Sequence, residues 1–160
     1  MDPIEAAKQR AVGGMEMFLR NFSHVPDDKL VWTPTPTAKS AIRIAAHTAL
    51  YAGRFAAMIR ERRLPIPADL GAWLAERDAE EIALTDRAEM ERVFRAGTAE
   101  VLAALDGLTA ADVDLTLDSG QGWTMPMTQL MVLPGWHATL HTGQIDYLQT
   151  CWDDQHVYVG

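Results

Sequence analysis

Residues 41–58 read AIRIAAHTALYAGRFAAM, and this stretch decides the fold class. Its apolar side chains recur every three or four positions, which is the spacing that gives an α-helix one apolar face. Hydroxyls between Thr37 and Ser40 can cap exposed amides, so we predict that the helix begins there and ends near Arg62. The residues predicted to face inward are Ala41, Ile44, His47, Thr48, Tyr51, Phe55 and Met58.

Three further stretches carry the same helical spacing. They cover residues 4–22, about 86–105 and about 127–152, and a shorter helix is predicted around residues 69–77. Gly107 ends the third long helix. Pro134 lies inside the last one, where its missing N–H donor predicts a kink or a restart.

The connections between these helices differ in length. Residues 21–28 contain turn residues, and two prolines hold Leu30 to Pro36 extended, so together they form a long linker. The segment 112–125 is compatible with either a small hairpin or an irregular loop. No alternation of strands and helices indicates a parallel sheet. The predicted fold class is therefore all-α: a four-helix bundle in one domain, residues 1–160, with one long crossover connection and a short irregular or hairpin segment before the last helix.

Composition excludes several functions. The net charge of -8 disfavours nucleic-acid binding, which depends on neutralising phosphates with Lys and Arg. Acidic residues between Asp69 and Asp106 are interpreted as a solvated helix face. No apolar window is long enough to span a membrane, and one cysteine, Cys151, cannot form an intramolecular disulfide. We therefore expect a cytoplasmic protein without nucleic-acid or membrane partners.

Three of the five histidines carry the chemistry. His137 and His141 are four residues apart, which places both imidazoles on one helix face. His47 lies on the apolar face of another helix. Three inward imidazoles each need their ring nitrogens satisfied, and ionising them side by side is costly, whereas one shared cation resolves both demands. Imidazole ligands favour Zn, Ni, Cu or Fe over Mg or Ca.

The motifs LVWTP at residues 30–34, SAIRIAAH at 40–47 and HATLHTGQI at 137–145 resemble the DinB-like (YfiT-like) metal-binding four-helix bundles. The resemblance extends over nearly the whole chain. It implies that His47, His137 and His141 are the metal ligands, that water fills the remaining positions, and that the metal is zinc or nickel. It also implies a homodimer.

Other side chains have weaker claims to a role. Tyr51 could donate to a metal-bound oxygen and Gln144 could orient a ligand, although packing is the commoner role for an inward tyrosine. Close helix packing is the expected reason for Gly143. The remaining expectations are buried rings at Trp32 and Trp136, exposed rings at His24 and His156, and no nucleophilic role for Cys151.

Three functions stay open at this level. The first is an enzyme with an open three-histidine metal site: the resemblance implies transfer of a small-molecule thiol to an electrophile or, less strongly, metal-dependent hydrolysis. The second is a non-catalytic, stress-related metal-binding module. The third is a metal-free bundle whose core histidines are hydrogen-bonded. No fourth Cys, His or acidic ligand stands out in the sequence, which favours an open site.

Overall fold

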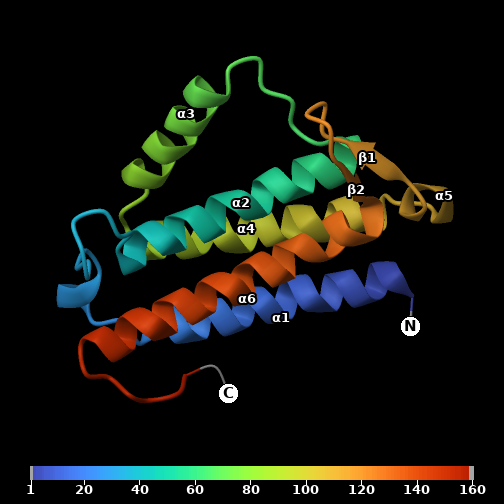
Figure 1. Ribbon diagram of the computed structural model, residues 1–160. Helices are drawn as coiled ribbons and strands as arrows, with labels where there is room; N and C mark the ends of the chain where they lie inside the picture. The colour runs from blue at the N-terminus through green and yellow to red at the C-terminus, as the bar shows by residue number, and fades with distance from the viewer. Residues whose placement is uncertain (1, 159–160) are drawn as a thin grey trace.

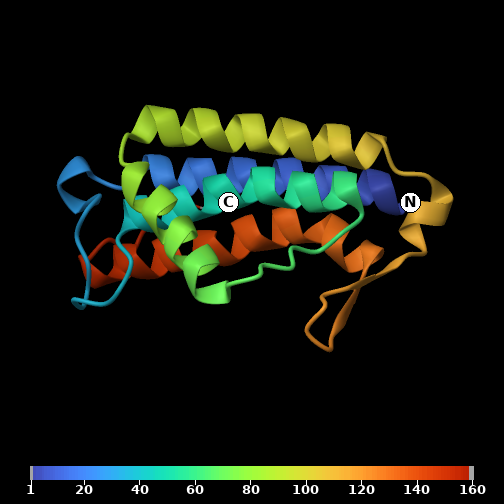
Figure 2. The same cartoon turned by 90° about the horizontal axis from the view of Figure 1, so that it is seen from above.

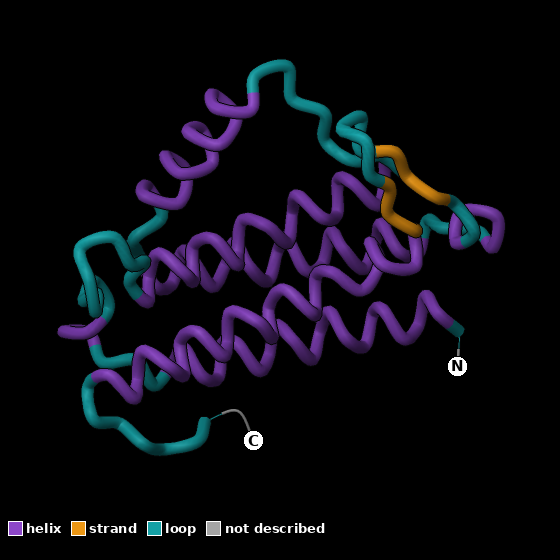
Figure 3. Tube along the Cα trace, in the orientation of Figure 1, coloured by secondary structure: helices purple, strands orange, loops and turns teal. Residues whose placement is uncertain are grey.

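The computed structural model describes residues 2–158, and helices make up most of it (Figure 1). Four long helices lie side by side: α1 (Pro3–Ser23), α2 (Ala41–Glu61), α4 (Arg87–Asp106) and α6 (Met127–Cys151). The shorter elements are η1 (Asp27–Lys29), α3 (Leu70–Ala83), α5 (Ala110–Val113), β1 (Thr116–Asp118) and β2 (Thr124–Pro126), and the strands form only a minor part (Figure 3). The prediction of an all-α bundle is confirmed.

The long helices form a ring in which α1 packs on α6 and α4, and α2 packs on the same two helices. In Figure 1, α1 and α6 run in one direction and α2 and α4 in the other. Because α2 and α4 are parallel neighbours, the chain must return along the bundle between them. Residues 62–86 supply this crossover, and its helix α3 packs on α2, outside the ring (Figure 2). The predicted short helix is longer than expected and reaches Ala83.

Local chemistry explains where the helices begin. The Asp2 carboxylate accepts from Ile4 N at 2.9 Å, and Asp86 does the same for Glu89 N at 2.8 Å. Ser40 occupies the position before α2, but its side chain makes no cap hydrogen bond, so its predicted capping role is wrong. Helix α2 ends where Arg62 adopts a left-handed conformation with φ 51°.

Two apolar clusters fill the bundle. One surrounds Phe18, Phe22 and Phe94, and the other surrounds Ile59 and Leu105. Along α2, His47 lies between Ile44 of the first cluster and Phe55 of the second. The histidine positions therefore fall where the two clusters meet, in the middle of the bundle.

Glycines permit a very close approach between α1 and α6. A Cβ atom on Gly135 would lie 2.3 Å from the Arg10 carbonyl oxygen, and one on Gly14 would lie 2.7 Å from the Gly135 carbonyl oxygen. Such backbone contact is possible only without a side chain. Gly143 has no atom within 4 Å of its ideal Cβ position, so the prediction that it permits close packing is wrong.

Helix α6 contains two further differences from expectation. It runs without interruption through Pro134, so the predicted restart is wrong. Trp136 is 58% exposed rather than buried, because it lies on the outer face of α6. Trp32 does pack against the core, with its ring centroid 5.7 Å from that of Trp152.

The segment before α6 is a hairpin. Strands β1 and β2 pair antiparallel with Leu117 opposite Met125, so of the two alternatives for residues 112–125 the hairpin is correct. Among residues 2–158, no helix combines the length and apolar character needed to cross a membrane.

Candidate metal centre

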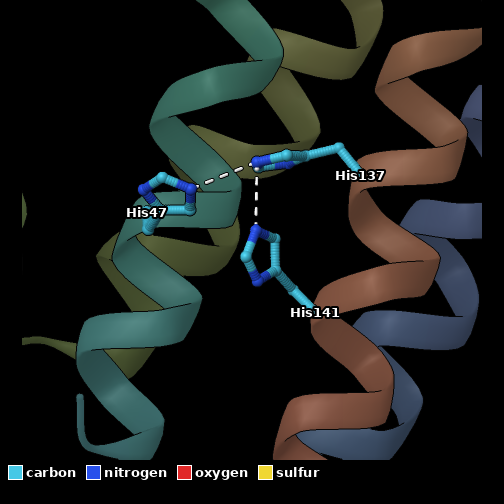
Figure 4. A group of neighbouring side chains, drawn as sticks. All are labelled: His47, His137 and His141. Atoms are coloured by element: carbon cyan, nitrogen blue, oxygen red, sulfur yellow. Dashed lines mark hydrogen bonds between the residues drawn. The ribbon is translucent and has the colours of Figure 1, made fainter. Parts of the chain in front are cut away.

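Three imidazoles converge between α2 and α6 (Figure 4). His137 Nε2 lies 3.2 Å from His47 Nε2 and 3.0 Å from His141 Nε2, and the ligand atoms of all three rings lie within 4.8 Å of one another. Zn–N bonds of about 2.0–2.1 Å in tetrahedral geometry place two nitrogens roughly 3.3 Å apart. Two of the three separations thus match the spacing of ligands on one ion, and the third, between His47 and His141, lies within 4.8 Å.

The helices explain this convergence. His137 and His141 are one turn apart on α6 and point toward α2, while His47 extends from α2 toward α6. The opposite side of α6 is fixed against α1 by the Gly14–Gly135 contact. The backbone that carries two of the three rings is therefore held by close packing directly behind them.

Outer hydrogen bonds orient two of the rings. The Nδ1–H of His47 donates to the Glu81 carboxylate at 2.6 Å, and the Nδ1–H of His141 donates to Gln144 Oε1 at 2.7 Å. Because the proton is on Nδ1, Nε2 of each neutral ring carries a free lone pair. This is the tautomer in which Nε2 can bind a metal. Gln144 thus contacts a triad histidine, and Glu81 occupies the equivalent place behind His47.

Protons alone cannot satisfy the three facing nitrogens. With His47 and His141 both presenting lone pairs, only His137 can carry a proton on Nε2, and that one proton faces two acceptors. One N–H cannot point at both acceptors, so at least one of the two contacts of about 3 Å lacks a directed hydrogen bond. A cation at the common point removes this conflict, so the donor set fits a divalent metal ion.

Burial keeps the triad neutral. Together with the nearby His141 and His47, which contribute less, burial lowers the pKa of His137 to about 3. Burial also lowers the pKa values of His47 and His141, although hydrogen bonds to Glu81 and Gln144 partly oppose this effect. Neutral imidazole is the form that binds metal, so the site is prepared at neutral pH.

Glu81 is the residue that the sequence analysis missed. It was grouped with a solvated acidic face, yet it is 3% exposed. Burial opposes its ionisation, but hydrogen bonds from Lys39 and His47 outweigh burial and lower the pKa of its carboxyl group. Nothing in the local sequence separates Glu81 from its acidic neighbours, because only the path of the crossover brings it to His47.

Tyr51 lies beside the triad rather than in it. Its ring centroid is 4.4 Å from that of His47 and 5.2 Å from that of His137. Its hydroxyl makes no hydrogen bond within residues 2–158 that would aim it at the triad, so its observed contribution is ring packing.

The other candidate residues lie elsewhere. His24 and His156 are exposed, as predicted, and His24 stacks on Tyr158 at 3.9 Å. Cys151 is exposed at the end of α6. Of His, Cys, Asp and Glu side chains in the described part of the chain, the group able to hold one ion is the triad.

Two hollows flank the site. One lies between α2 and α6, has a volume of about 590 Å³, and is lined by Lys39, Gln144 and Tyr147 among others. The second lies between α2 and α3, has a volume of about 190 Å³, and includes Tyr51 and Trp73 in its lining. Each hollow is lined by one residue that contacts a triad histidine: Gln144 in the first hollow and Tyr51 in the second.

Comparison with solved structures identifies similar folds. A mycothiol-dependent maleylpyruvate isomerase superposes with a TM-score of 0.69 at 15% identity, covering 89% of this chain and 60% of the isomerase. A histidine-to-alanine variant of that isomerase gives a TM-score of 0.67 at 13% identity with the same coverage. This chain therefore spans less than two thirds of the isomerase.

A second relative is similar in length. A DinB-like protein of Bacillus subtilis, YjoA, superposes with a TM-score of 0.65 at 17% identity, covering 95% of this chain and 93% of that one. At these identities the likeness concerns the fold alone.

The sequence comparisons give the family. No curated protein matches this chain in sequence. The model of the DinB superfamily matches residues 13–145, a span that includes α2 and α4, parts of α1 and α6, and all three histidines of the triad. This chain belongs to the DinB superfamily.

Proposed function

We propose that this protein is a metal-dependent enzyme that transfers a small-molecule thiol to a small electrophile, with His47, His137 and His141 as the metal ligands. The observation that carries the proposal is the convergence of three Nε2 atoms. In His47 and His141, hydrogen bonds from Nδ1–H to Glu81 and Gln144 leave the lone pair of Nε2 free for a metal. Zinc or nickel suits this donor set.

An open site favours catalysis over a structural role. Structural zinc sites usually have four protein ligands, whereas three protein ligands are typical of catalytic ones. Glu81 is held behind His47, with Lys39 on its other oxygen, and so does not serve as a fourth ligand in this geometry. A divalent ion held by three imidazoles supplies a Lewis acid that lowers the pKa of a thiol or water at its open positions.

Two features favour thiol transfer over hydrolysis. A transferase has two small substrates to accommodate, and two hollows flank the triad. Metal-dependent hydrolases often use a free carboxylate as general base, but the carboxylate nearest the triad, Glu81, is already bonded to His47 and Lys39. The fold neighbour named as mycothiol-dependent adds support from outside the chain.

The test begins with metal content. Protein purified without a histidine tag should contain about one zinc or nickel ion per chain by elemental analysis, and His137→Ala should lose it. The control is His24→Ala, whose ring is exposed and remote from the triad. Less than about half an equivalent in the unmodified protein would overturn the metal site.

The thiol step is tested separately. Metal-loaded protein should accelerate conjugation of glutathione, bacillithiol or mycothiol to monochlorobimane, in which a sulfur–carbon bond forms, chloride leaves and the thiol proton passes to the buffer. Full metal content without acceleration for any of the three thiols would favour the non-catalytic module instead.

Location and assembly belong to the same proposal. A single cysteine fits a reducing cytoplasm. A homodimer is supported by large exposed side chains on one face of α6: Trp136 at 58%, Leu140 at 47% and Tyr147 at 67%. Light scattering should give about twice the monomer mass, and Trp136→Gln should shift the equilibrium toward monomer.

A further inference from the structure

The crossover that carries α3 buries almost none of its own side chains. Leu64 lies in one apolar cluster of the bundle and Leu84 packs against the other, so both ends of the crossover are fixed. Between these anchors, in residues 65–83, the one buried residue is Glu81. Three large apolar side chains of α3 are about half exposed: Leu70, Leu74 and Ile82. Apolar burial therefore contributes little to the attachment of α3, unlike that of the four long helices.

Charged pairs attach α3 to α2 instead. Asp78 pairs with Arg43 at 2.6 Å, and Glu80 pairs with Arg54. Both acidic partners are about half exposed, and ion pairs at such positions add little stability. The hollow of about 190 Å³ between the two helices also shows that they do not pack closely along their length. We therefore expect α3 to undock from α2 far more readily than the whole bundle unfolds.

Glu81 differs from the other acidic residues of α3 because it contacts the triad. Its carboxylate accepts from Nδ1–H of His47 at 2.6 Å and from Lys39 through its second oxygen. A glutamate is rarely buried unless its charge is paired in this way. When α3 undocks, Glu81 moves away with it, and Nδ1–H of His47 loses its acceptor. The state of α3 is thus felt at a triad ring.

The two nitrogens of His47 connect α3 to the triad. Nε2 faces His137 at 3.2 Å, and Nδ1 faces Glu81. An imidazole whose Nε2 lone pair is bound to a cation keeps its proton on Nδ1, where it is a good donor to a carboxylate. A carboxylate at Nδ1 in turn makes Nε2 a more basic ligand. Each event therefore favours the other, and linkage requires the two effects to be equal in size.

We propose that α3 is a metal-responsive strap: its docking on α2 is coupled to metal occupancy of the triad through the hydrogen bond between His47 and Glu81. In the metal-free protein α3 undocks readily and uncovers the hollow that Tyr51 lines beside the triad. In the loaded protein α3 stays closed over this hollow. The inference rests on the proposed function, because it assigns regulation to the same metal site.

Hydrogen exchange of the full chain, followed by mass spectrometry, measures the docking of α3. A helix of 14 residues is marginally stable alone, so its amides exchange when it undocks. Zinc should slow the exchange of residues 70–83 by about 10- to 100-fold, the factor typical of a hydrogen bond to a metal ligand. The hairpin at residues 116–126, at one end of the bundle (Figure 1), is the internal reference and should change less than about twofold.

Two variants separate coupling from a general weakening of α3. Glu81→Gln, saturated with zinc as checked by elemental analysis, should reduce the zinc effect on residues 70–83 to below about threefold. Glu80→Gln is the matched control, because it breaks the neighbouring pair with Arg54 and leaves the acceptor of His47 in place. It should speed exchange in both states and retain the zinc effect. Circular dichroism should be unchanged in both variants.

Three outcomes would overturn the coupling. The first is equal exchange of residues 70–83 with and without zinc in the unmodified protein, a comparison that needs no variant. The second is a full zinc effect in Glu81→Gln. The third is loss of the zinc effect in Glu80→Gln to the same extent as in Glu81→Gln, which would assign it to charge on α3 in general.

These results separate the strap from the enzyme. If zinc slows exchange in α3 through Glu81 but no thiol is conjugated, the coupling stands and the site belongs to a non-catalytic module. If metal content and conjugation are intact but exchange in α3 ignores zinc, the enzyme proposal stands and the strap fails. A chain that binds no zinc would overturn both.

Discussion

The two sides of α6 differ sharply in what they contact. Toward α1, Gly135 and Ala138 bring two backbones together, and a Cβ on Gly135 would lie 2.3 Å from the Arg10 carbonyl oxygen. Toward α2, His137 and His141 extend large polar rings that meet a third ring with their nitrogens about 3 Å apart. These four residues lie within seven positions of one another in one helix.

The difference shows how a bundle can keep a polar site in its middle. The side toward α1 uses small residues, so the position of the α6 backbone is set by contact that leaves no room for adjustment. The side toward α2 then presents its rings at a fixed distance from His47. If this interpretation is correct, changes on the small side should mainly alter stability, and changes behind the rings should mainly alter metal binding.

The largest effect is expected on the small side. Gly135→Ala places a methyl group against backbone atoms of α1 that cannot move aside, so we expect a loss of about 3 kcal/mol or more in the free energy of unfolding. Urea denaturation measures it. A loss below about 1 kcal/mol would show that α1 and α6 can separate without penalty, contrary to the fixed-backbone interpretation.

The next effect concerns the support behind His47. Glu81→Gln replaces the carboxylate that accepts the hydrogen bond from Nδ1–H of His47 with a neutral amide. We expect zinc affinity to fall by roughly 10- to 100-fold, with a much smaller change in the free energy of unfolding. Competition with a chromogenic chelator gives the affinity. Glu91→Gln, on the exposed face of α4 and paired with Arg95, should leave it unchanged. Equal affinities for all three proteins would show that Glu81 has only a packing role.

The third prediction concerns pH and the metal-free protein. The pKa of His137 is about 3 when folded, against 6.5 for the ordinary group, so between these values the unfolded chain binds a proton that the folded chain does not. Stability should therefore fall as the pH decreases through this window, by about 1–2 kcal/mol from His137 between pH 7 and pH 5.

Comparison with a variant isolates that contribution. His137→Gln should reduce the pH dependence of the free energy of unfolding, whereas His24→Gln, whose ring is exposed, should retain it. Parallel pH profiles for His137→Gln and the unmodified protein would contradict the assignment of a neutral, buried ring.

The smallest change in stability is expected for a second glycine of α6, Gly143. Gly143→Ala adds a methyl group where no atom lies within 4 Å, in the interior of a helix, and should raise the free energy of unfolding by about 0.5–1 kcal/mol. Thermal denaturation beside Gly135→Ala makes the contrast direct: the same substitution in one helix should have opposite signs. The prediction applies to the monomer, because Gly143 lies on the α6 face that the proposed homodimer would cover, so a loss of stability in the monomer would contradict it.

Much of the fold could be predicted from sequence because it depends on local spacing. The apolar periodicity placed all four long helices to within a few residues, and the i, i+4 relation of His137 and His141 held because both lie in one unbroken helix. His47 was found because a histidine on an apolar stripe must face the core. Trp136 and Gly143 were predicted wrongly, since residue type alone does not say which side of α6 meets a neighbour.

The sequence by itself determined the helices, the bundle class and the three imidazoles that face inward, because each follows from which residues share a helix face. Only the tertiary structure decided that Glu81 lies behind His47, that Gly135 rather than Gly143 makes the close contact, and that Glu80 of α3 pairs with Arg54 of α2. The first and the last depend on the path of the crossover between α2 and α4, and the second depends on how α1 packs on α6. Contacts between residues tens of positions apart leave no periodic trace in the chain, so they appear only once the helices are packed.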